Sequence, residues 1–135
     1  MCDTHVYVIH VDLNDPRPLE EQIAAEVRQA IARGEVGPGE ELPTVRQLAG
    51  DLGVHWNTVA RAYRRLADEH VLVVRRGRGA VVRDDVPAAT SAARSALRDR
   101  LVEAIARGRV RGLSVRDISA VFQDALKQFG DPRKS

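Results

Sequence analysis

One sequence feature restricts the fold of this chain more than any other: two short helical patterns lie on either side of Gly53, and two β-favouring runs follow at once. The first pattern begins at Thr44, where Thr-Val-Arg-Gln supplies the side chains of a capping box. The second has apolar residues at helical spacing at Val59, Ala62 and Leu66. Two short helices joined by a tight turn that contains glycine predict a helix-turn-helix.

A β-hairpin is predicted directly after the second helix. Residues 71–74 and 80–82 favour strands, and the connection between them is rich in glycine. Its tip carries Arg75, Arg76 and Arg78. A hairpin in this position is a wing, so residues 18–83 are predicted to form a winged helix-turn-helix.

The residues before the helix-turn-helix predict a strand and a further helix. Residues 5–13 are rich in β-branched and aromatic side chains and end at Asn-Asp-Pro, which predicts a short strand whose partner the sequence does not identify. From Pro18 onward, apolar residues recur every four positions, which predicts a helix that ends near Gly34. We therefore expect residues 1–83 to form one domain.

The remaining residues predict a linker and two more helices. Residues 84–93 are small and polar and contain proline, which is typical of a linker. Helical spacing and a capping box from Ser114 to Asp117 predict two helices within residues 94–130. Such helices have little to pack against within one chain, so we predict that a second copy covers their apolar seam. The predicted dimerisation residues are Leu97, Leu101, Ile105, Ile118, Phe122, Leu126 and Phe129.

Two smaller features of the sequence carry predictions of their own. Residues 30–34 and 104–108 both read Ala-Ile-Ala-Arg-Gly, which we interpret as a repeated helix stop rather than a duplicated domain. The first helix of the tail is predicted to end near Gly108 and Gly112. The phenylalanine and tyrosine side chains are predicted to be buried in a hydrophobic core. These are Tyr7, Tyr63, Phe122 and Phe129.

Length and composition bound the fold class. A chain of 135 residues with 44% hydrophobic and 30% charged residues is typical of a soluble globular protein with one ordinary core and a short appendage. The expected class is mostly α with a small β component. No apolar run approaches the ~20 residues of a membrane span, and the N-terminus has no signal-peptide pattern, so we expect a cytoplasmic protein without membrane partners.

The sequence predicts neither a metal or cofactor site nor an active site. Cys2 is the single cysteine, and the four histidines lack metal-site spacing. A strand would place His5 and His10 on opposite faces, so they would not converge with Cys2 on one ion. No nucleophile and base pair, paired carboxylates or phosphate-binding loop points to an enzyme.

The charge distribution points to nucleic acid more strongly than the net charge of +2. Residues 1–45 carry three cations against nine anions, a net charge of −6. Residues 46–83 carry eight arginines against three anions, a net charge of +5, and the rest of the chain is +3. A compact positive segment is the electrostatic footprint of a phosphate-binding face, and the guanidinium fork suits phosphate oxygens and guanine edges.

Several separated blocks, in order, carry a resemblance to a known family. They are Asp15-Pro16-Arg17-Pro18-Leu19 with Gln22-Ile23, Pro38-Gly39, Leu42 to Ala49, Gly53-Val54, Asn57-Thr58-Val59 with Ala62-Tyr63 and Leu66, and Arg76 to Gly79. This half of the chain resembles the DNA-binding domain of the GntR-type bacterial transcription regulators. The two-helix tail is similar to the YtrA-like branch, whose members have a small dimerising extension. The resemblance implies a dimer on a palindromic operator, commonly a repressor of its own operon.

The resemblance also implies which residues meet DNA. The arginine of the second helix contacts DNA, the third helix starts in the major groove and the wing enters the minor groove. Helical spacing adds Arg61 and Arg64, which lie opposite the apolar side of the third helix. The predicted DNA-binding set is Arg46, Trp56, Asn57, Thr58, Arg61, Arg64, Arg76, Arg78 and Gly79.

Several of these positions have a second, purely structural interpretation. Arg64 and its neighbour Arg65 could equally form a solvated helix face, and the wing arginines could only protect a strand edge. Asn57 could pair with adenine or bond its own backbone, and Thr58 could contact phosphate or cap the helix. Trp56 could meet a thymine methyl group or pack against the wing or the first turn.

The family often has Ser or Thr before the third helix and a polar or basic residue next, where this chain has His55 and Trp56. Since imidazole is not a favoured N-cap, a weakened cap is expected.

The sequence therefore predicts a sequence-specific DNA-binding transcription regulator that works as a homodimer on double-stranded DNA. The alternative is a nucleoid- or plasmid-associated protein that binds DNA without sequence preference. The sequence identifies neither the operator nor the regulated genes, and it does not decide between repressor and activator. A tail of about forty residues is too small to enclose a small-molecule effector alone, so such a ligand would sit at a dimer or domain junction.

Overall fold

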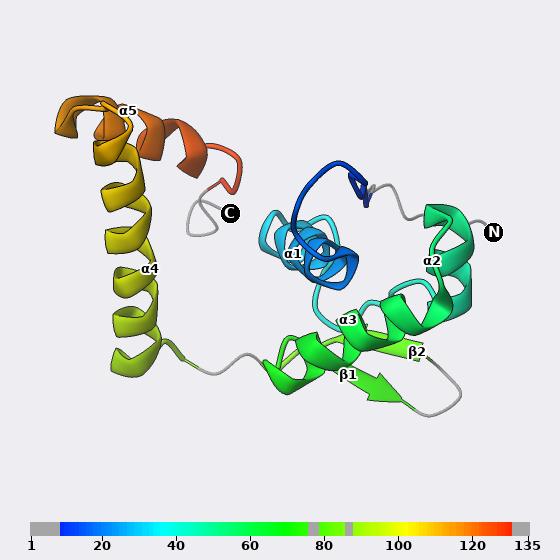
Figure 1. Ribbon diagram of the computed structural model, residues 1–135. Helices are drawn as coiled ribbons and strands as arrows, with labels where there is room; N and C mark the ends of the chain where they lie inside the picture. The colour runs from blue at the N-terminus through cyan, green and yellow to red at the C-terminus, as the bar shows by residue number, and fades with distance from the viewer. Residues whose placement is uncertain (1–8, 76–78, 86–87, 131–135) are drawn as a thin grey trace. The chain divides into compact units, whose positions relative to one another are not determined.

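The computed structural model describes residues 9–75, 79–85 and 88–130, which form five helices and one hairpin (Figure 1). They divide into two compact units, residues 1–85 and residues 86–135. The first unit contains α1 (Leu19–Ala32), α2 (Val45–Leu52), α3 (Trp56–Asp68), β1 (Leu72–Arg75) and β2 (Gly79–Val82). The second contains α4 (Ser91–Val110) and α5 (Val115–Leu126).

The core of the first unit lies around α3. Helices α1 and α2 and strand β1 all pack on α3. The apolar stripe of α3, which includes Val59, Ala62 and Leu66, is completely buried, and Ile23 and Val27 of α1 are buried against it. This arrangement confirms the predicted winged helix-turn-helix.

The turn between α2 and α3 is built as the sequence predicts. Thr44 accepts a hydrogen bond from the Gln47 backbone N–H at 3.1 Å, and the Gln47 side chain accepts from the Thr44 N–H at 2.9 Å, which completes the capping box. Gly53 ends α2 with a φ of 70°, a left-handed conformation that glycine adopts without strain. The Tyr63 hydroxyl donates to the Pro43 carbonyl oxygen at 2.7 Å and so ties α3 to the loop before α2.

The hairpin is antiparallel, with Val73 opposite Val81 and Arg75 opposite Gly79. The chain that precedes α2 adds to its other side, because the Leu42 N–H donates to the Ala80 carbonyl and the Val82 N–H donates to the Glu40 carbonyl, both at 2.9 Å. The hairpin is therefore fixed to the loop that leads into the helix-turn-helix. Residues 76–78, and with them the predicted sites Arg76 and Arg78, lie outside the described residues.

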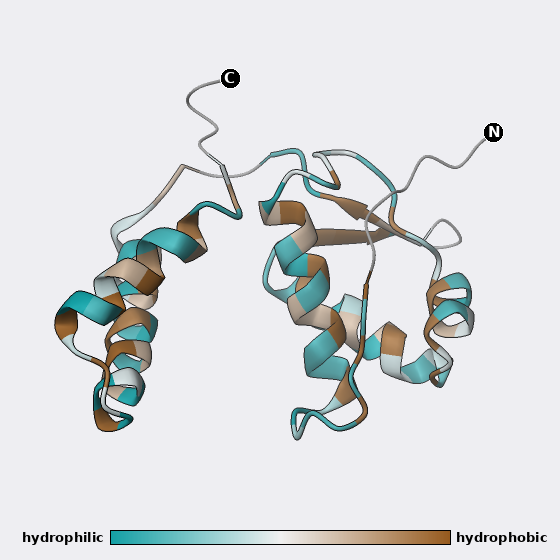
Figure 2. Ribbon diagram, turned by 90° about the horizontal axis from the view of Figure 1, so that it is seen from above, coloured by the Kyte–Doolittle hydropathy of each residue, from teal (hydrophilic) through white to brown (hydrophobic). Residues whose placement is uncertain are grey.

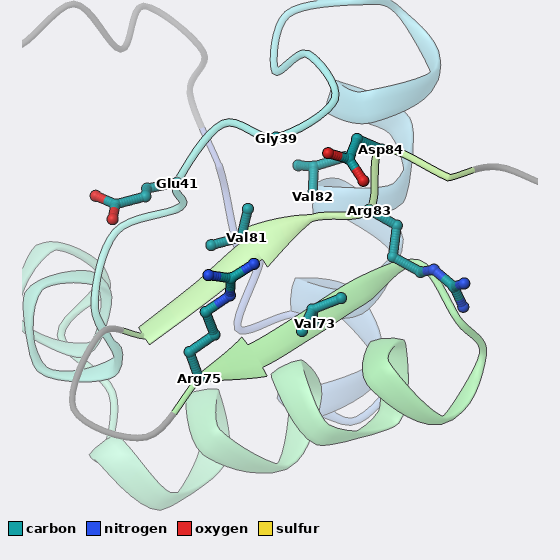
Figure 3. A pocket seen from close by; sticks show the side chains of 8 residues that line it. All are labelled: Gly39, Glu41, Val73, Arg75, Val81, Val82, Arg83 and Asp84. Atoms are coloured by element: carbon teal, nitrogen blue, oxygen red, sulfur yellow. The ribbon is translucent and has the colours of Figure 1, made fainter.

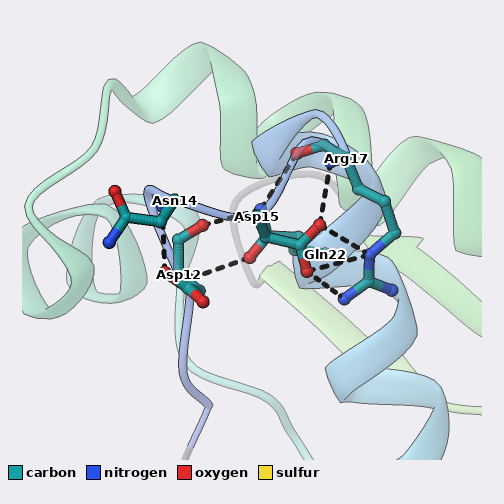
Figure 4. A network of polar contacts seen from close by, with 5 residues as sticks. All are labelled: Asp12, Asn14, Asp15, Arg17 and Gln22. Atoms are coloured by element: carbon teal, nitrogen blue, oxygen red, sulfur yellow. Dashed lines mark hydrogen bonds and ion pairs between the residues drawn. The ribbon is translucent and has the colours of Figure 1, made fainter.

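The predicted strand at residues 5–13 is wrong in its described part. Residues 5–8 lie outside the described residues, and residues 9–13 form no strand. The backbone of Asp12 instead pairs with the side chain of Gln22: its N–H donates to Gln22 Oε1 at 2.8 Å, and its carbonyl accepts from Nε2 at 3.1 Å (Figure 4). Nε2 also donates to the Arg17 carbonyl, and Gln22 is 3% exposed. One buried amide thus supplies the donor and acceptor that a neighbouring strand would offer.

The second unit is a helical hairpin in which α4 packs on α5. The Ser114 and Asp117 side chains form the predicted capping box. Helix α4 begins at Ser91 with Thr90 as its cap, so residues 91–93, predicted to be linker, form its first turn. The capping hydrogen bond from the Ala93 N–H to the Thr90 hydroxyl, at 3.0 Å, is the reason for this earlier start.

The repeated pentapeptide ends a helix only once. At Gly34 the backbone turns left-handed, with a φ of 81°, just after α1 ends. The matching Gly108 stays helical, and α4 ends at Val110, between the two glycines near which the sequence predicts its end, before Gly112 turns left-handed with a φ of 100°. Gly108 lies where α4 meets α5, because a Cβ atom there would be 3.4 Å from Ile118 Cδ1 and Leu113 Cδ1. In the part of the chain that the structure describes, no helix is long and apolar enough to cross a membrane.

Candidate nucleic-acid interface

Helix α3 presents one polar face to solvent. Arg61 and Arg64 are exposed, and they lie on the side opposite the buried stripe of Val59, Ala62 and Leu66. Across the described ranges, no hydrogen bond or ion pair engages either guanidinium group. The face that the sequence predicts to meet DNA is therefore free to do so.

On the side of α3 that faces α1, the charged residues form ion pairs. Arg65 forms an ion pair with Glu20 at 3.6 Å, and Glu69 accepts from Arg28 at 2.9 Å and 3.1 Å. The first contact joins α3 to α1, and the second joins the C-cap residue of α3 to α1. Of the two neighbouring arginines with an open interpretation, Arg65 has a structural partner, whereas Arg64 has none among the residues described.

The start of α2 and the base of the wing lie side by side. A Cβ atom at Gly79 would be 3.8 Å from the Thr44 Cα atom. Arg46 stands in the first turn of α2, two residues after Thr44, and its side chain is exposed and makes no ion pair within the described residues. The structure therefore joins two of the predicted DNA-binding positions, Arg46 and Gly79, at one corner of the first unit.

The N-terminus of α3 is capped, contrary to expectation. The Asn57 backbone N–H donates to His55 Nδ1 at 3.0 Å, so the imidazole acts as an N-cap after all. Trp56 is 55% exposed, and its indole stacks on the imidazole, with ring centroids 5.6 Å apart and an interplanar angle of 28°. The signal that sequence reasoning missed is that a histidine with a free Nδ1 lone pair accepts a hydrogen bond like the side chain of serine.

Asn57 and Thr58 are half-buried in the first turn of α3. Their backbone N–H groups donate to the side chain and to the carbonyl oxygen of His55, both at 3.0 Å. Within the described ranges, neither side chain makes a hydrogen bond, so the alternative in which Asn57 bonds its own backbone is not seen.

The outer face of the hairpin holds a shallow hollow of about 210 Å³. Figure 3 shows that the Glu41 and Arg83 side chains point away from it. Arg83 instead makes two hydrogen bonds of 2.8 Å to Asp85, which raise the pKa of Arg83 and lower that of Asp85. The charged groups do not converge on a ligand. The lining residues are Gly39, Glu41, Val73, Arg75, Val81, Val82, Arg83 and Asp84.

The remaining predicted positions lie in the second unit. Phe122 is 43% exposed, and Phe129 is also exposed, so their assignment to a core is wrong within the single chain, whereas Tyr63 is buried as predicted. Figure 2 shows hydrophobic residues along both α4 and α5. All seven predicted dimerisation residues are exposed or half-exposed: Leu97, Leu101, Ile105, Ile118, Phe122, Leu126 and Phe129.

The described part of the chain contains no group of three or more His, Cys, Asp or Glu residues that could hold a metal ion. His10 is exposed, while Cys2, His5 and Tyr7 lie outside the described residues.

Comparison with known proteins supports the fold. The family described as bacterial regulatory proteins, gntR family, matches residues 19–82. The HTH-type transcriptional regulator Rv1152 of Mycobacterium tuberculosis is 47% identical over 70 residues, 52% of this chain and 57% of that protein. The HTH-type transcriptional repressor YtrA of Bacillus subtilis is 33% identical over 78 residues, 58% of this chain and 60% of that protein. The chain thus spans less than two thirds of the length of these two relatives.

Two solved structures extend the comparison. AraR(DBD) in complex with operator ORX1 is 25% identical with a TM-score of 0.50, over 54% of this chain and 96% of that chain. YtrA from Sulfolobus acidocaldarius, a GntR-family transcription factor, is 40% identical with a TM-score of 0.60, over 73% of this chain and 97% of that chain. The relatives are named as regulators, which agrees with the prediction that the chain is not an enzyme. Together with the family match over the winged helix-turn-helix, they show that the chain belongs to the GntR family of DNA-binding bacterial transcription regulators, in its YtrA-like branch.

Proposed function

We propose that the protein is a sequence-specific homodimeric repressor that occupies a palindromic operator. The observation that carries the proposal is that the arginines fall into two groups, one without ion pairs and one paired with glutamates. Arg61, Arg64 and Arg46 are exposed and make no ion pair among the described residues, while Arg65 and Arg28 pair with glutamates on the flank toward α1. Unpaired cations on one side of a reading helix suit phosphate and base contacts.

In the proposed complex the first turn of α3 enters the major groove. Asn57 pairs with adenine N6 and N7, and the exposed indole of Trp56 meets a thymine methyl group. Arg46 and Arg64 contact phosphates that fix the position of the helix. The wing, with Gly79 at its base, follows the neighbouring minor groove.

The second unit supplies the proposed dimer. Its seam of exposed apolar side chains gives a second copy something to cover, and large exposed apolar patches are typical of interaction sites. Two-fold symmetry then places the reading helices about 34–36 Å apart, one turn of the duplex. The Bacillus subtilis relative is named as a repressor, which supports repression by occupancy. A regulator of a bacterial chromosome works in the cytoplasm, and we propose that location.

The test starts with selection of bound DNA from a random pool, followed by titration of the selected duplex by fluorescence anisotropy. Arg61→Ala is expected to weaken binding at least tenfold, since hydrogen bonds of charged groups contribute about 1.5–3 kcal/mol. Arg28→Ala removes an arginine that the structure assigns to Glu69, and it serves as the matched control with affinity close to wild type. Equal loss in both variants would contradict the proposed face.

Salt and competitor DNA separate specific recognition from general DNA binding. The logarithm of affinity should fall with the logarithm of salt concentration by ~0.9 for each phosphate neutralised. A hundredfold excess of mixed-sequence DNA should leave the selected complex largely intact. If competitor of any sequence displaces the protein equally well, the chain is a nucleoid- or plasmid-associated DNA-binding protein instead.

A further inference from the structure

We infer that His55 is a positioning residue for base recognition by Trp56. The inference rests on the proposed function, because it concerns how the proposed reading helix holds its one exposed aromatic side chain. His55 need not touch a base: the structure makes it the support against which the indole rests.

The imidazole is fixed by the helix itself. Its Nδ1 atom accepts from the Asn57 backbone N–H at 3.0 Å, so that nitrogen carries no hydrogen and the ring is held in one orientation at the N-cap. Neither an alkyl side chain nor a lysine could do this, because both lack an acceptor. The cap thus determines where the plane of the ring lies.

The position of the Trp56 indole depends on the plane of the His55 ring. Its ring lies 5.6 Å from the imidazole, centroid to centroid, at 28°, and 55% of Trp56 is exposed. Trp56 is the first residue of α3, where no preceding helical turn restricts its side chain. One face is therefore supported by His55 while the rest of the ring is presented to solvent at the point where the helix would enter the groove.

A base preference should follow from this geometry. A thymine methyl group packed against the indole contributes about fourfold in affinity over the same base without the methyl group. Replacing each thymine of the selected duplex in turn by deoxyuridine identifies the contacted position. At that position, discrimination should require both His55 and Trp56, although only Trp56 makes the contact.

Two substitutions separate the capping hydrogen bond of His55 from its ring stacking on Trp56. In His55→Asn the side chain remains a good N-cap but loses the ring, so thermal stability should stay near wild type while the discrimination of thymine from deoxyuridine falls to about onefold. In His55→Phe the ring remains without the cap acceptor, so stability should fall and more of the discrimination should survive. A cycle with Trp56→Ala tests the coupling, since His55→Asn should change nothing further in that background.

The tryptophan also reports on its own position, because it is the only one in the chain. Its fluorescence should change when the selected duplex binds, and the free protein should show a different emission in His55→Asn at unchanged helix content. Unchanged emission in His55→Asn would mean that the imidazole does not set the surroundings of the indole.

The outcomes are distinct. If the wild-type protein prefers no sequence at all, the proposed function itself fails. If it prefers a sequence but discriminates thymine from deoxyuridine at no position, or if His55→Asn retains full discrimination, the positioning role is overturned while the proposed function stands. An equal effect of His55→Asn with and without Trp56 would also overturn it, because His55 would then contact DNA directly.

Discussion

Both units contain helices with apolar side chains, yet only the first unit buries them. Every buried hydrophobic side chain of the described residues lies between Ile9 and Val82. In α4 and α5 no described residue is buried, and Leu97 is 59% exposed. A helix pair of this size rarely supplies its own core. An apolar pattern therefore specifies a helix in both units, whereas only the first unit completes a core within the single chain. The proposed dimer would cover the apolar side chains of the second.

The strongest way to break this comparison is to remove a core side chain from the first unit. Leu66→Ala deletes a fully buried group where α1, α3 and β1 meet, and it should cost about 2–5 kcal/mol of unfolding free energy. Chemical denaturation followed by circular dichroism measures the loss. Leu97→Ala is the control of identical chemistry in the second unit, and at concentrations too low for dimers it should cost far less. Equal costs would show that the second unit has a core of its own.

The next largest effect should appear in the proposed dimer. Phe122→Ala truncates an exposed aromatic ring of α5 and should weaken self-association about thirtyfold or more, the effect of a central interface residue worth ~2 kcal/mol. Sedimentation velocity measures the dimer, and denaturation of the first unit should be unchanged. Gln123→Ala, an exposed polar neighbour in the same helix, is the control. A dimer that survives Phe122→Ala at wild-type strength would move the interface elsewhere.

The two capping boxes allow a matched test. Thr44→Ala in the first unit and Ser114→Ala in the second each remove a side-chain acceptor for the N3 backbone N–H, a loss of about 1 kcal/mol. We expect Thr44→Ala to lower the stability of the whole first unit, whereas Ser114→Ala should only increase fraying of α5. Amide hydrogen exchange distinguishes these results. Uniformly faster exchange throughout the first unit in Ser114→Ala would mean that the two units unfold together.

The smallest effect concerns pH, because the capping box of α2 has the neutral Gln47 at N3, whereas that of α5 has the acidic Asp117. Hydrogen bonds from the Ser114 backbone and hydroxyl group hold the pKa of Asp117 below its ordinary value, while Gln47 does not titrate. Because this pKa is lowered, the contribution of the Asp117 carboxylate to the stability of α5 is complete above the ordinary carboxylate pKa of about 4. It is lost as the pH falls through the lowered pKa. Helix α5 should therefore fray in acid. Asp117→Asn should abolish that dependence, and an unchanged acid response would assign it to another carboxylate.

Much of the first unit could be predicted because its local signals agree with its packing. The face of α3, the capping box at Thr44 and the turn at Gly53 each depend on neighbours in sequence. The same agreement allows helical spacing to predict that Arg61 and Arg64 lie on the open side of α3.

The errors arose where a distant side chain decided the outcome. The segment around Asp12 looks like a strand, but its partner is the amide of Gln22, ten residues away. The pentapeptide that ends α1 continues as helix at Gly108, where Ile118 and Leu113 lie close to the backbone. The His55 cap was missed for a different reason, since propensity ranks imidazole low without considering its lone pair.

The contact between Gly79 and Thr44 has a consequence for the shape of the DNA. The base of the wing lies beside the cap of α2, and the hairpin is hydrogen-bonded to the loop before α2. We expect these contacts to restrict how far the separation between the hairpin and the proposed reading helix can adapt to the duplex. In a complex of the proposed kind, the duplex would have to supply the matching groove width. The stiffness of base steps that no side chain touches would then enter the affinity, and operators with the same contacted bases would bind unequally.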